Sequence, residues 1–268
     1  KKFPANRLLA FENCFAGRTL TLSQITDKSA YRSGLPTTIF VDYVPFFSWE
    51  KPEESIKESV TQLNKYLDRY PGQHAAMIFE LVLGEGGFFP GTTEFFTALM
   101  DILRAHDIAI FVDEIQTFGR TTELFAFQHF GLDKYVDVVT LGKSAQVCAT
   151  LFSDNFAPKP GLLSQTFTTS TSALFAAEAI ICEMIEGDYF GPDGKILQFH
   201  NYFKERLIQI ATRNPGLVSG PFGIGAMIAF TPFGGDPDKV KEFLYALFDA
   251  GVIAFYAGHD LSRVRFLL

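Results

Sequence analysis

The sequence is poor in cysteine: its three cysteines, Cys14, Cys148 and Cys182, lie far apart and form no CxxC pair. That number and spacing exclude a disulfide framework and a cysteine zinc site, and they favour a reducing compartment. Long apolar runs are also absent, since none approaches the roughly 18 residues that a membrane span needs. The start, Lys1–Pro4, lacks the apolar core of a signal peptide. We therefore expect a soluble, cytoplasmic protein.

An excess of positive charge is missing as well. The 23 Lys and Arg residues face 30 Asp and Glu residues, which gives a net charge of −7. This balance argues against binding to nucleic acid or to anionic membranes, because both require clustered cations. The five histidines show no metal-ligand spacing, so no metal site is expected. The chain has no initiator Met and stops in an apolar run typical of a strand, so we expect both ends to continue in a longer protein.

What the sequence does contain is a globular composition and two strand-like runs that end in charged residues. Of its 268 residues, 47% are hydrophobic and 20% charged, which suits one large domain or a domain and a half. The apolar run Ile108–Val112 is typical of a strand buried on both faces of a parallel sheet, and it ends in Asp113. A second run, Val136–Leu141, leads into Lys143. Ligands in open α/β sheets lie beyond the carboxyl ends of the strands, so Asp113 and Lys143 are candidate site residues.

Helical patterns lie between the strand-like runs. Pro and acids open an expected helix over 51–70, and an apolar stripe predicts a second helix over 92–106. Strand, helix and strand in this order predict right-handed crossovers and an α/β fold with a mostly parallel sheet. Gly84–Gly87 is too rich in glycine to be helix or strand. Glycines and proline around residue 190 predict a boundary between a large domain, 1–190, and a smaller α+β domain, 191–268.

An acid and a lysine at two strand ends suit one kind of chemistry. A lysine held out of water has a lowered pKa and can form a Schiff base, usually with the aldehyde cofactor pyridoxal 5′-phosphate. The cofactor's ring nitrogen needs a carboxylate, and at about 4 Å and an effective dielectric of about 20 this pair gains roughly 4 kcal/mol. Asp113 suits that role; Glu114 should point to the opposite face, and Gln116 is placed to reach the phenolic oxygen. On spacing alone, an acid that caps a loop and a solvated lysine are the simpler explanation.

Four stretches, in the same order along the chain, resemble motifs of the class III (ornithine and 4-aminobutyrate type) aminotransferases, which are fold type I pyridoxal-phosphate enzymes. Phe111–Thr121 looks like the DE-[IV]-Q-T-GFGRT signature with one glycine missing, and Leu124–Gly131 is similar to LFAFEHxG. Thr140–Ser144 matches the Schiff-base motif, and Leu83–Gly87 the Q-GEGG loop. The resemblance runs over nearly the whole chain. It implies a three-layer α/β sandwich plus part of a smaller C-terminal α+β domain.

The same resemblance implies roles for the residues that touch the cofactor. Lys143 matches the Schiff-base lysine and proton carrier, Asp113 the partner of the ring nitrogen, and Gln116 the neighbour of the phenolic oxygen. Phe15 matches the aromatic that stacks on the ring, although an ordinary core Phe explains it as simply. Thr166 matches the threonine that reaches the cofactor phosphate of the neighbouring subunit. The alternative is a loop threonine without a special role. A homodimer with a shared active site is therefore expected.

Three further matches concern the phenolic side of the cofactor and the substrate. Glu80 matches the acid that lies near the phenolic oxygen. Glu85 matches the glutamate that in many members switches between an arginine and the substrate. Arg265 matches that arginine, which would hold the substrate's α-carboxylate by a bidentate contact.

The chain departs from the family pattern at several positions. Ala16 stands where the family has a histidine beside the ring, and Ala145–Ala149 replaces a glycine-rich run. Thr168–Ser170 replaces the usual GGN. The serine- and glycine-rich turn that cradles the cofactor phosphate should precede Lys1. These departures bear on substrate and on catalytic competence.

The resemblance implies ping-pong transfer of an amino group. The donor would be an amino acid or ω-amine such as ornithine, acetylornithine, lysine or 4-aminobutyrate, and the acceptor 2-oxoglutarate. Two alternatives stay open: a racemase, epimerase or aminomutase that keeps the cofactor on the same fold, and a non-catalytic, dimerising relative.

Overall fold

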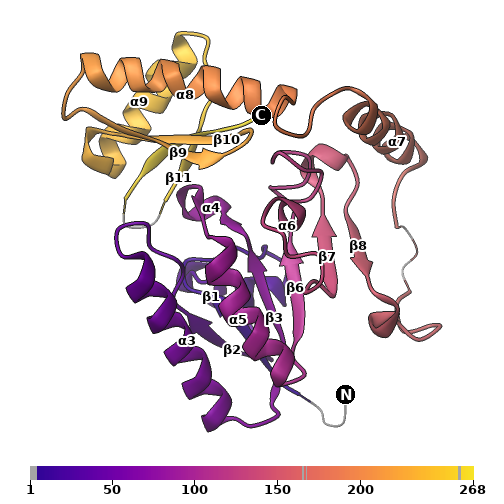
Figure 1. Ribbon diagram of the computed structural model, residues 1–268. Coiled ribbons are helices and arrows are strands. Elements are labelled where there is room, and N and C mark those ends of the chain that lie inside the picture. Colours follow the sequence, from indigo (N-terminus) through magenta and orange to yellow (C-terminus); the bar gives the residue numbers. More distant parts are fainter. Residues whose placement is uncertain (1–4, 165, 167, 259–260) are drawn as a thin grey trace.

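The first half of the chain forms a six-stranded sheet in the computed structural model, which describes residues 5–164, 166, 168–258 and 261–268 (Figure 1). The strand order is β2-β1-β3-β6-β7-β8, and all neighbouring pairs run parallel except β7 and β8. The strands are β1 (Arg7–Phe11), β2 (Phe40–Val44), β3 (His74–Glu80), β6 (Ala109–Asp113), β7 (Val138–Leu141) and β8 (Ala149–Phe152). The predicted α/β class with a mostly parallel sheet is confirmed.

Two long helices, α3 (Pro52–Arg69) and α5 (Thr93–Ala105), lie side by side against this sheet (Figure 1). Pro52 and two acids occupy the first turn of α3, where free N–H groups and the helix dipole favour them. Thr92 caps α5, because its hydroxyl accepts a hydrogen bond from the Phe95 N–H at 3.2 Å. Both helices start and end within one residue of the predicted bounds.

The core between the sheet and the two helices is mainly aromatic. Phe11 of β1 has its ring centroid 5.3 Å from that of Phe79 in β3 and 5.4 Å from that of Phe95 in α5. Leu63 of α3 and Phe96 of α5 are fully buried beside them. Each such side chain contributes about 1.5–3 kcal/mol by leaving water. This core fixes the positions of the strands whose carboxyl ends carry the candidate site.

A second sheet is built from the last part of the chain and lies above the carboxyl ends of the first (Figure 1). It is antiparallel, with order β11-β12-β10-β9. Its elements are α8 (Lys195–Arg213), β9 (Val218–Ile224), β10 (Met227–Pro232), α9 (Pro237–Asp249), β11 (Phe255–Ala257) and β12 (Arg263–Leu267). Helix α7 (Thr171–Glu186) precedes it, and the domain boundary at residue 190 stays a prediction.

The remaining elements are short. They are α1 (Leu22–Ile25), α2 (Ser29–Arg32), β4 (Val82–Leu83), α4 (Gly84–Gly87), β5 (Phe89–Pro90), α6 (Ala126–His129) and 3₁₀ turns at Lys143–Ala145, Asp154–Phe156 and Phe233–Gly235. None of the helices within the described ranges is long and apolar enough to cross a membrane.

Helix α4 corrects one expectation, because Gly84–Gly87 was predicted to be neither helix nor strand. Glycine has low intrinsic helix propensity, so this turn is held from outside. The Gly84 N–H donates to Glu80 at 2.9 Å, and the carbonyls of Gly84 and Gly87 accept from Arg265 at 2.9 Å and Arg263 at 2.7 Å. Side chains remote in sequence thus supply partners for both ends of the turn.

Candidate active site

The carboxyl ends of neighbouring strands bring the candidate residues to one edge of the large sheet. Glu80 at the end of β3 lies in register with Asp113 at the end of β6, and Asp113 with Thr140 of β7. Lys143 begins the 3₁₀ turn that follows β7, and Phe15 lies in the loop after β1. Four separate segments therefore meet where an α/β sheet places its ligands.

Asp113 is a half-buried acid whose charge is poorly solvated. Burial raises the pKa of its carboxyl to about 6, against the opposing effects of a hydrogen bond from the Ile115 N–H at 2.9 Å and of the nearby Lys143. Glu114, next in the chain, is fully buried elsewhere and accepts hydrogen bonds from the N–H groups of Ala126 and Phe127 at 3.0 and 2.9 Å. Asp113 is thus free to face a ligand, while Glu114 caps α6.

Lys143 is an exposed residue whose ammonium group is partly desolvated and lies among other charges. Desolvation lowers the pKa of its ammonium group, Arg265 lowers it further, and the negative charges of Glu85 and Asp113 act in the opposite direction. Its backbone φ is +47°, in the left-handed region that a non-glycine residue adopts at a cost. The lysine therefore lies within electrostatic reach of both the Asp113 strand and the Glu85–Arg265 pair.

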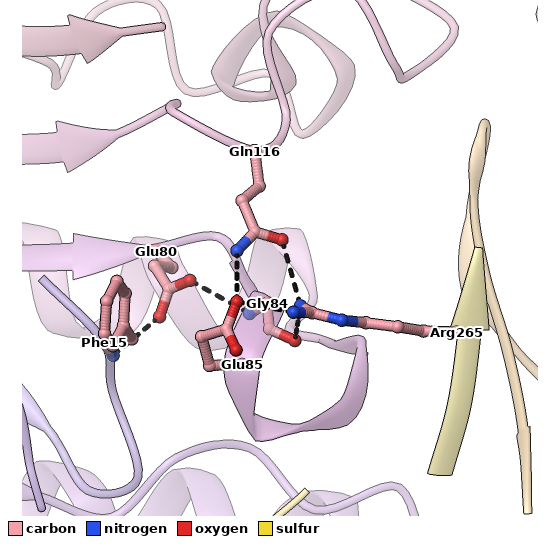
Figure 2. A network of polar contacts seen from close by, with 6 residues as sticks. All are labelled: Phe15, Glu80, Gly84, Glu85, Gln116 and Arg265. Carbon is pink, nitrogen blue, oxygen red and sulfur yellow. Dashed lines mark hydrogen bonds and ion pairs between the residues drawn. The ribbon is translucent and has the colours of Figure 1, made fainter. Parts of the chain in front are cut away.

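Glu80 lies between two backbone segments and joins them by hydrogen bonds (Figure 2). One carboxylate oxygen accepts from the Phe15 N–H at 3.0 Å and the other from the Gly84 N–H at 2.9 Å. The side chain is entirely buried, and burial together with the charge of Asp113 raises its pKa to about 8. Its contacts position the loop that carries Phe15, which is half-buried, and the start of α4.

Glu85 and Arg265, predicted as a pair, form a salt bridge across 180 residues of sequence (Figure 2). The Arg265 guanidinium donates to Glu85 Oε1 at 2.6 Å and to the Gly84 carbonyl at 2.9 Å. The side chain of Glu85 is 36% exposed and that of Arg265 10%. The glutamate therefore has room to turn away, whereas the arginine is held in place by β12 and α4.

Gln116 joins this salt bridge. Its amide N–H donates to Glu85 Oε1 at 3.1 Å, and its carbonyl oxygen accepts from Arg265 at 3.4 Å (Figure 2). The amide packs so closely on α4 that a Cβ at Gly84 would lie 2.5 Å from Gln116 Oε1. The predicted contact of Gln116 with a cofactor oxygen stays a prediction, but the side chain lies between the strand ends and the Glu85–Arg265 pair.

Thr166 is not among the residues that the strand ends bring together. It is exposed, in the segment between β8 and α7. Its role at the phosphate of a neighbouring subunit stays a prediction.

Two buried arginines beside the site did not follow from the sequence. Arg120 donates to the Gln116 backbone carbonyl at 3.0 Å and so holds the segment after β6. Arg263 precedes Arg265 by two positions on β12 and contacts the far end of α4. Strand alternation places residues i and i+2 on one face, so Arg263 is expected on the same face of β12 as Arg265.

Comparison with known proteins places the chain in a family. The model of the family "Aminotransferase class-III" matches residues 3–268. The chain belongs to this family. It is 29% identical over 266 residues to the acetylornithine aminotransferase of Streptococcus mutans, with 96% of this chain and 64% of that protein covered. It is 31% identical over 217 residues to the L-lysine-epsilon aminotransferase of Mycobacterium bovis, with 78% and 46% covered.

The fold agrees with solved structures of the family. The lysine aminotransferase from M. tuberculosis superposes with a TM-score of 0.83 at 25% identity, covering 97% of this chain and 61% of that one. The fold is therefore that of fold type I transaminases. The chain spans less than two thirds of the length of these relatives.

Class III aminotransferases use pyridoxal 5′-phosphate, and the strand-end residues fit its ring and its aldehyde. Asp113 is a desolvated acid with a raised pKa, and a protonated ring nitrogen would stabilise its charged carboxylate form. Lys143 is an amine with a lowered pKa on the neighbouring strand end. Phe15 and Gln116 are positioned by Glu80 and Arg120, so the face and the phenolic side of a ring between them have partners.

Proposed function

We propose that the protein to which this chain belongs is a pyridoxal-phosphate-dependent aminotransferase. It takes the amino group of an amino acid or ω-amine of the ornithine, acetylornithine, lysine or 4-aminobutyrate type and passes it to a keto acid such as 2-oxoglutarate. The observation that carries this proposal is the meeting of Lys143, Asp113 and the Glu85–Arg265 pair at one sheet edge. The cofactor, when bound, supplies an electron-withdrawing ring that stabilises negative charge on the substrate's reacting carbon.

The residues of the chain divide the remaining work. Lys143, with its lowered pKa, would accept the proton from the substrate's amino-bearing carbon and would deliver it to the C4′ carbon of a bound cofactor. The Asp113 carboxylate holds the proton on the ring nitrogen. Arg265 binds the carboxylate of the acceptor when Glu85 turns away, and Glu85 neutralises Arg265 when the donor has no carboxylate there.

A panel of amino donors assayed with 2-oxoglutarate tests the proposal. We expect 2-oxoglutarate-dependent formation of glutamate with at least one ω-amine donor, and none with Lys143→Ala. Turnover of an amino acid without any keto acid would instead indicate an isomerase. A holoprotein whose cofactor absorbance is unchanged in Lys143→Ala would overturn the assignment of that lysine.

We also propose that the enzyme is a homodimer with a shared active site. Among the residues that the structure describes between β8 and α8, four large apolar side chains are more than 60% exposed, which supports a contact surface. They are Leu162, Leu163, Phe175 and Ile185. Thr166 lies in the same stretch of chain.

Light scattering after gel filtration checks the dimer. Phe175→Glu is expected to give monomers with reduced activity, because a charge on an interface costs several kcal/mol. Tyr245→Glu, on the exposed face of α9, is the matched control and should stay dimeric. A monomeric unaltered protein with full activity would contradict the proposal.

A further inference from the structure

A cavity of about 600 Å³ lies where loops of the large sheet meet β9 and α8 of the second sheet. This volume falls within the roughly 300–1,000 Å³ typical of small-molecule sites. Its lining includes five aromatic residues, Phe47, Trp49, Phe88, Phe89 and Phe222. None of the residues assigned above to amino transfer lines it, so the proposed reaction does not account for the cavity.

Arg263 is the buried cation in the wall of this cavity. It is 3% exposed, and its guanidinium lies between two rings, 3.9 Å from the centroid of Phe89 and 3.7 Å from that of Phe222. One N–H donates to the Gly87 carbonyl at 2.7 Å, and Nε has no hydrogen-bond partner. Burial lowers the pKa of Arg263 to about 10, so the group stays charged at neutral pH.

The neighbouring arginine shows what Arg263 lacks. Arg265 projects from the same face of β12 and is neutralised by Glu85 at 2.6 Å. For Arg263, no ion pair with an acid is found among the residues that the structure describes. The two rings stabilise the cation through their faces, but cation–π contacts leave the charge itself uncompensated.

The other charges on the wall favour an anion as the partner. Lys204 of α8 adds a second cation, and Glu50 is the acid among the lining residues. Both are exposed, whereas Arg263 is buried, so the guanidinium dominates the potential inside the cavity.

We propose that this cavity is a second binding site, for an organic carboxylate with an aromatic or branched apolar body. The carboxylate pairs with Arg263, and the apolar body packs on Trp49 and Phe47. Because the walls come from both sheets, an occupant also fixes the second sheet against the first. The rival explanation is that Arg263 only pins Phe89 to Phe222 as a structural contact.

Trp49 can report on the site, because it lies in the cavity wall; it is the one tryptophan among these 268 residues. Its fluorescence in the cofactor-loaded protein should change on titration with 4-phenylbutyrate, and calorimetry should give the same affinity. The neutral isostere 4-phenylbutyramide should bind at least about tenfold more weakly, because it lacks the negative charge that pairs with the guanidinium.

Three variants identify the cation. Arg263→Met should remove the difference in affinity between the acid and the amide. Arg265→Met should keep this difference in affinity, which would exclude the proposed active site as the place of binding. Lys204→Met should change the affinity for the acid less than about threefold, as expected of an exposed charge.

Equal binding of the acid and the amide, or no binding of either at millimolar concentration, would overturn the proposal, and so would loss of acid binding in Arg265→Met. If Arg263→Met does not fold, the comparison of acid and amide on the unaltered protein still decides. Neither outcome depends on whether the protein transfers amino groups.

Discussion

Glu80 accepts one backbone N–H with each of its oxygens, although it is entirely buried and next to Asp113. The two N–H donors favour the charged carboxylate, whereas burial and the charge of Asp113 favour the neutral acid. Burial and Asp113 have the larger effect, so the pKa of Glu80 is raised to about 8. At neutral pH this carboxyl is thus largely protonated in the cofactor-free protein, and both forms hold Phe15 and Gly84 in place.

The raised pKa of Glu80 predicts how stability depends on pH. For an acid whose pKa is higher in the folded state, the stability is present below the unfolded value of 4.5 and is lost as the pH rises through about 8. Glu80→Gln should be less stable at pH 7, since one N–H then faces an amide NH₂, at a cost of about 1–3 kcal/mol. The gap to the unaltered protein should narrow by about 1 kcal/mol or more between pH 7 and pH 9.

Urea unfolding of both cofactor-free proteins from pH 7 to pH 9 measures this gap. The range lies above the pKa of about 6 for Asp113, which limits the contribution of that group. A gap that stays constant over this range would show that Glu80 is ionised throughout.

At the scale of single residues, the sequence was informative where a residue follows a strand. Asp113 and Lys143 were predicted because parallel strands place their carboxyl ends at one edge, and Glu85 and Arg265 through motifs alone. The contact of Gln116 with that salt bridge was not predictable, because it depends on how β12 docks. Strand alternation places Arg263 on the same face of β12 as Arg265, but nothing local in the sequence marks it as buried between two rings.

Secondary-structure elements differ in how far their own residues, and not distant contacts, stabilise them. Helices α3 and α5 were predicted nearly to the residue, since proline and acids mark the start of α3 and an apolar stripe marks α5. Helix α4 was not, because its residues disfavour a helix and its partners are Glu80, Arg263 and Arg265. Such an element exists only once distant segments have docked.

A methyl group on α4 should therefore disturb the site more than the helix. In Gly84→Ala the new Cβ would lie 2.5 to 2.7 Å from the amide atoms of Gln116, so the glutamine must move and its contacts with Glu85 and Arg265 are lost. We expect a loss of about 1–3 kcal/mol in the free energy of unfolding, together with a raised KM for the keto acid.

The double variant Gly84→Ala/Gln116→Ala separates the clash from any effect on the α4 backbone. Removing the glutamine leaves the methyl group room, so the double variant should be more stable than the sum of the two single changes predicts. Strict additivity of the two free-energy changes would mean that the clash with Gln116 is not what destabilises Gly84→Ala.

At the scale of the whole molecule, the second sheet completes a site that begins on the first. Besides the arginine contacts described above, its docking contacts include backbone hydrogen bonds: the Ala226 N–H donates to the Arg120 carbonyl at 2.8 Å, and the Gly258 N–H to that of Glu85 at 2.9 Å. The composition predicted two parts but not this contact, since backbone groups carry no sequence signal. These contacts help to hold β12 over α4, where Arg265 reaches Glu85.

A change in this docking should separate carboxylate binding from cofactor binding. Gly225 lies in the turn between β9 and β10 at φ +55°, and a Cβ there would be 1.9 Å from the Arg120 carbonyl oxygen. The Arg120 backbone cannot move aside at low energetic cost, so Gly225→Ala should shift the second sheet, and Arg265 with it. We expect the KM for 2-oxoglutarate to rise about 10- to 100-fold, with the cofactor absorbance unchanged, because Asp113 and Lys143 belong to the first sheet.

Gly234→Ala is the matched control for this prediction. Gly234 also has a left-handed backbone, at φ +64°, but a Cβ there meets nothing within 4 Å. Both variants therefore bear the same conformational cost, about 1 kcal/mol, and only Gly225→Ala adds the clash between the sheets. A similar rise in KM in both variants would assign the effect to backbone strain, whereas a rise in Gly225→Ala alone would assign it to the docking of the sheets.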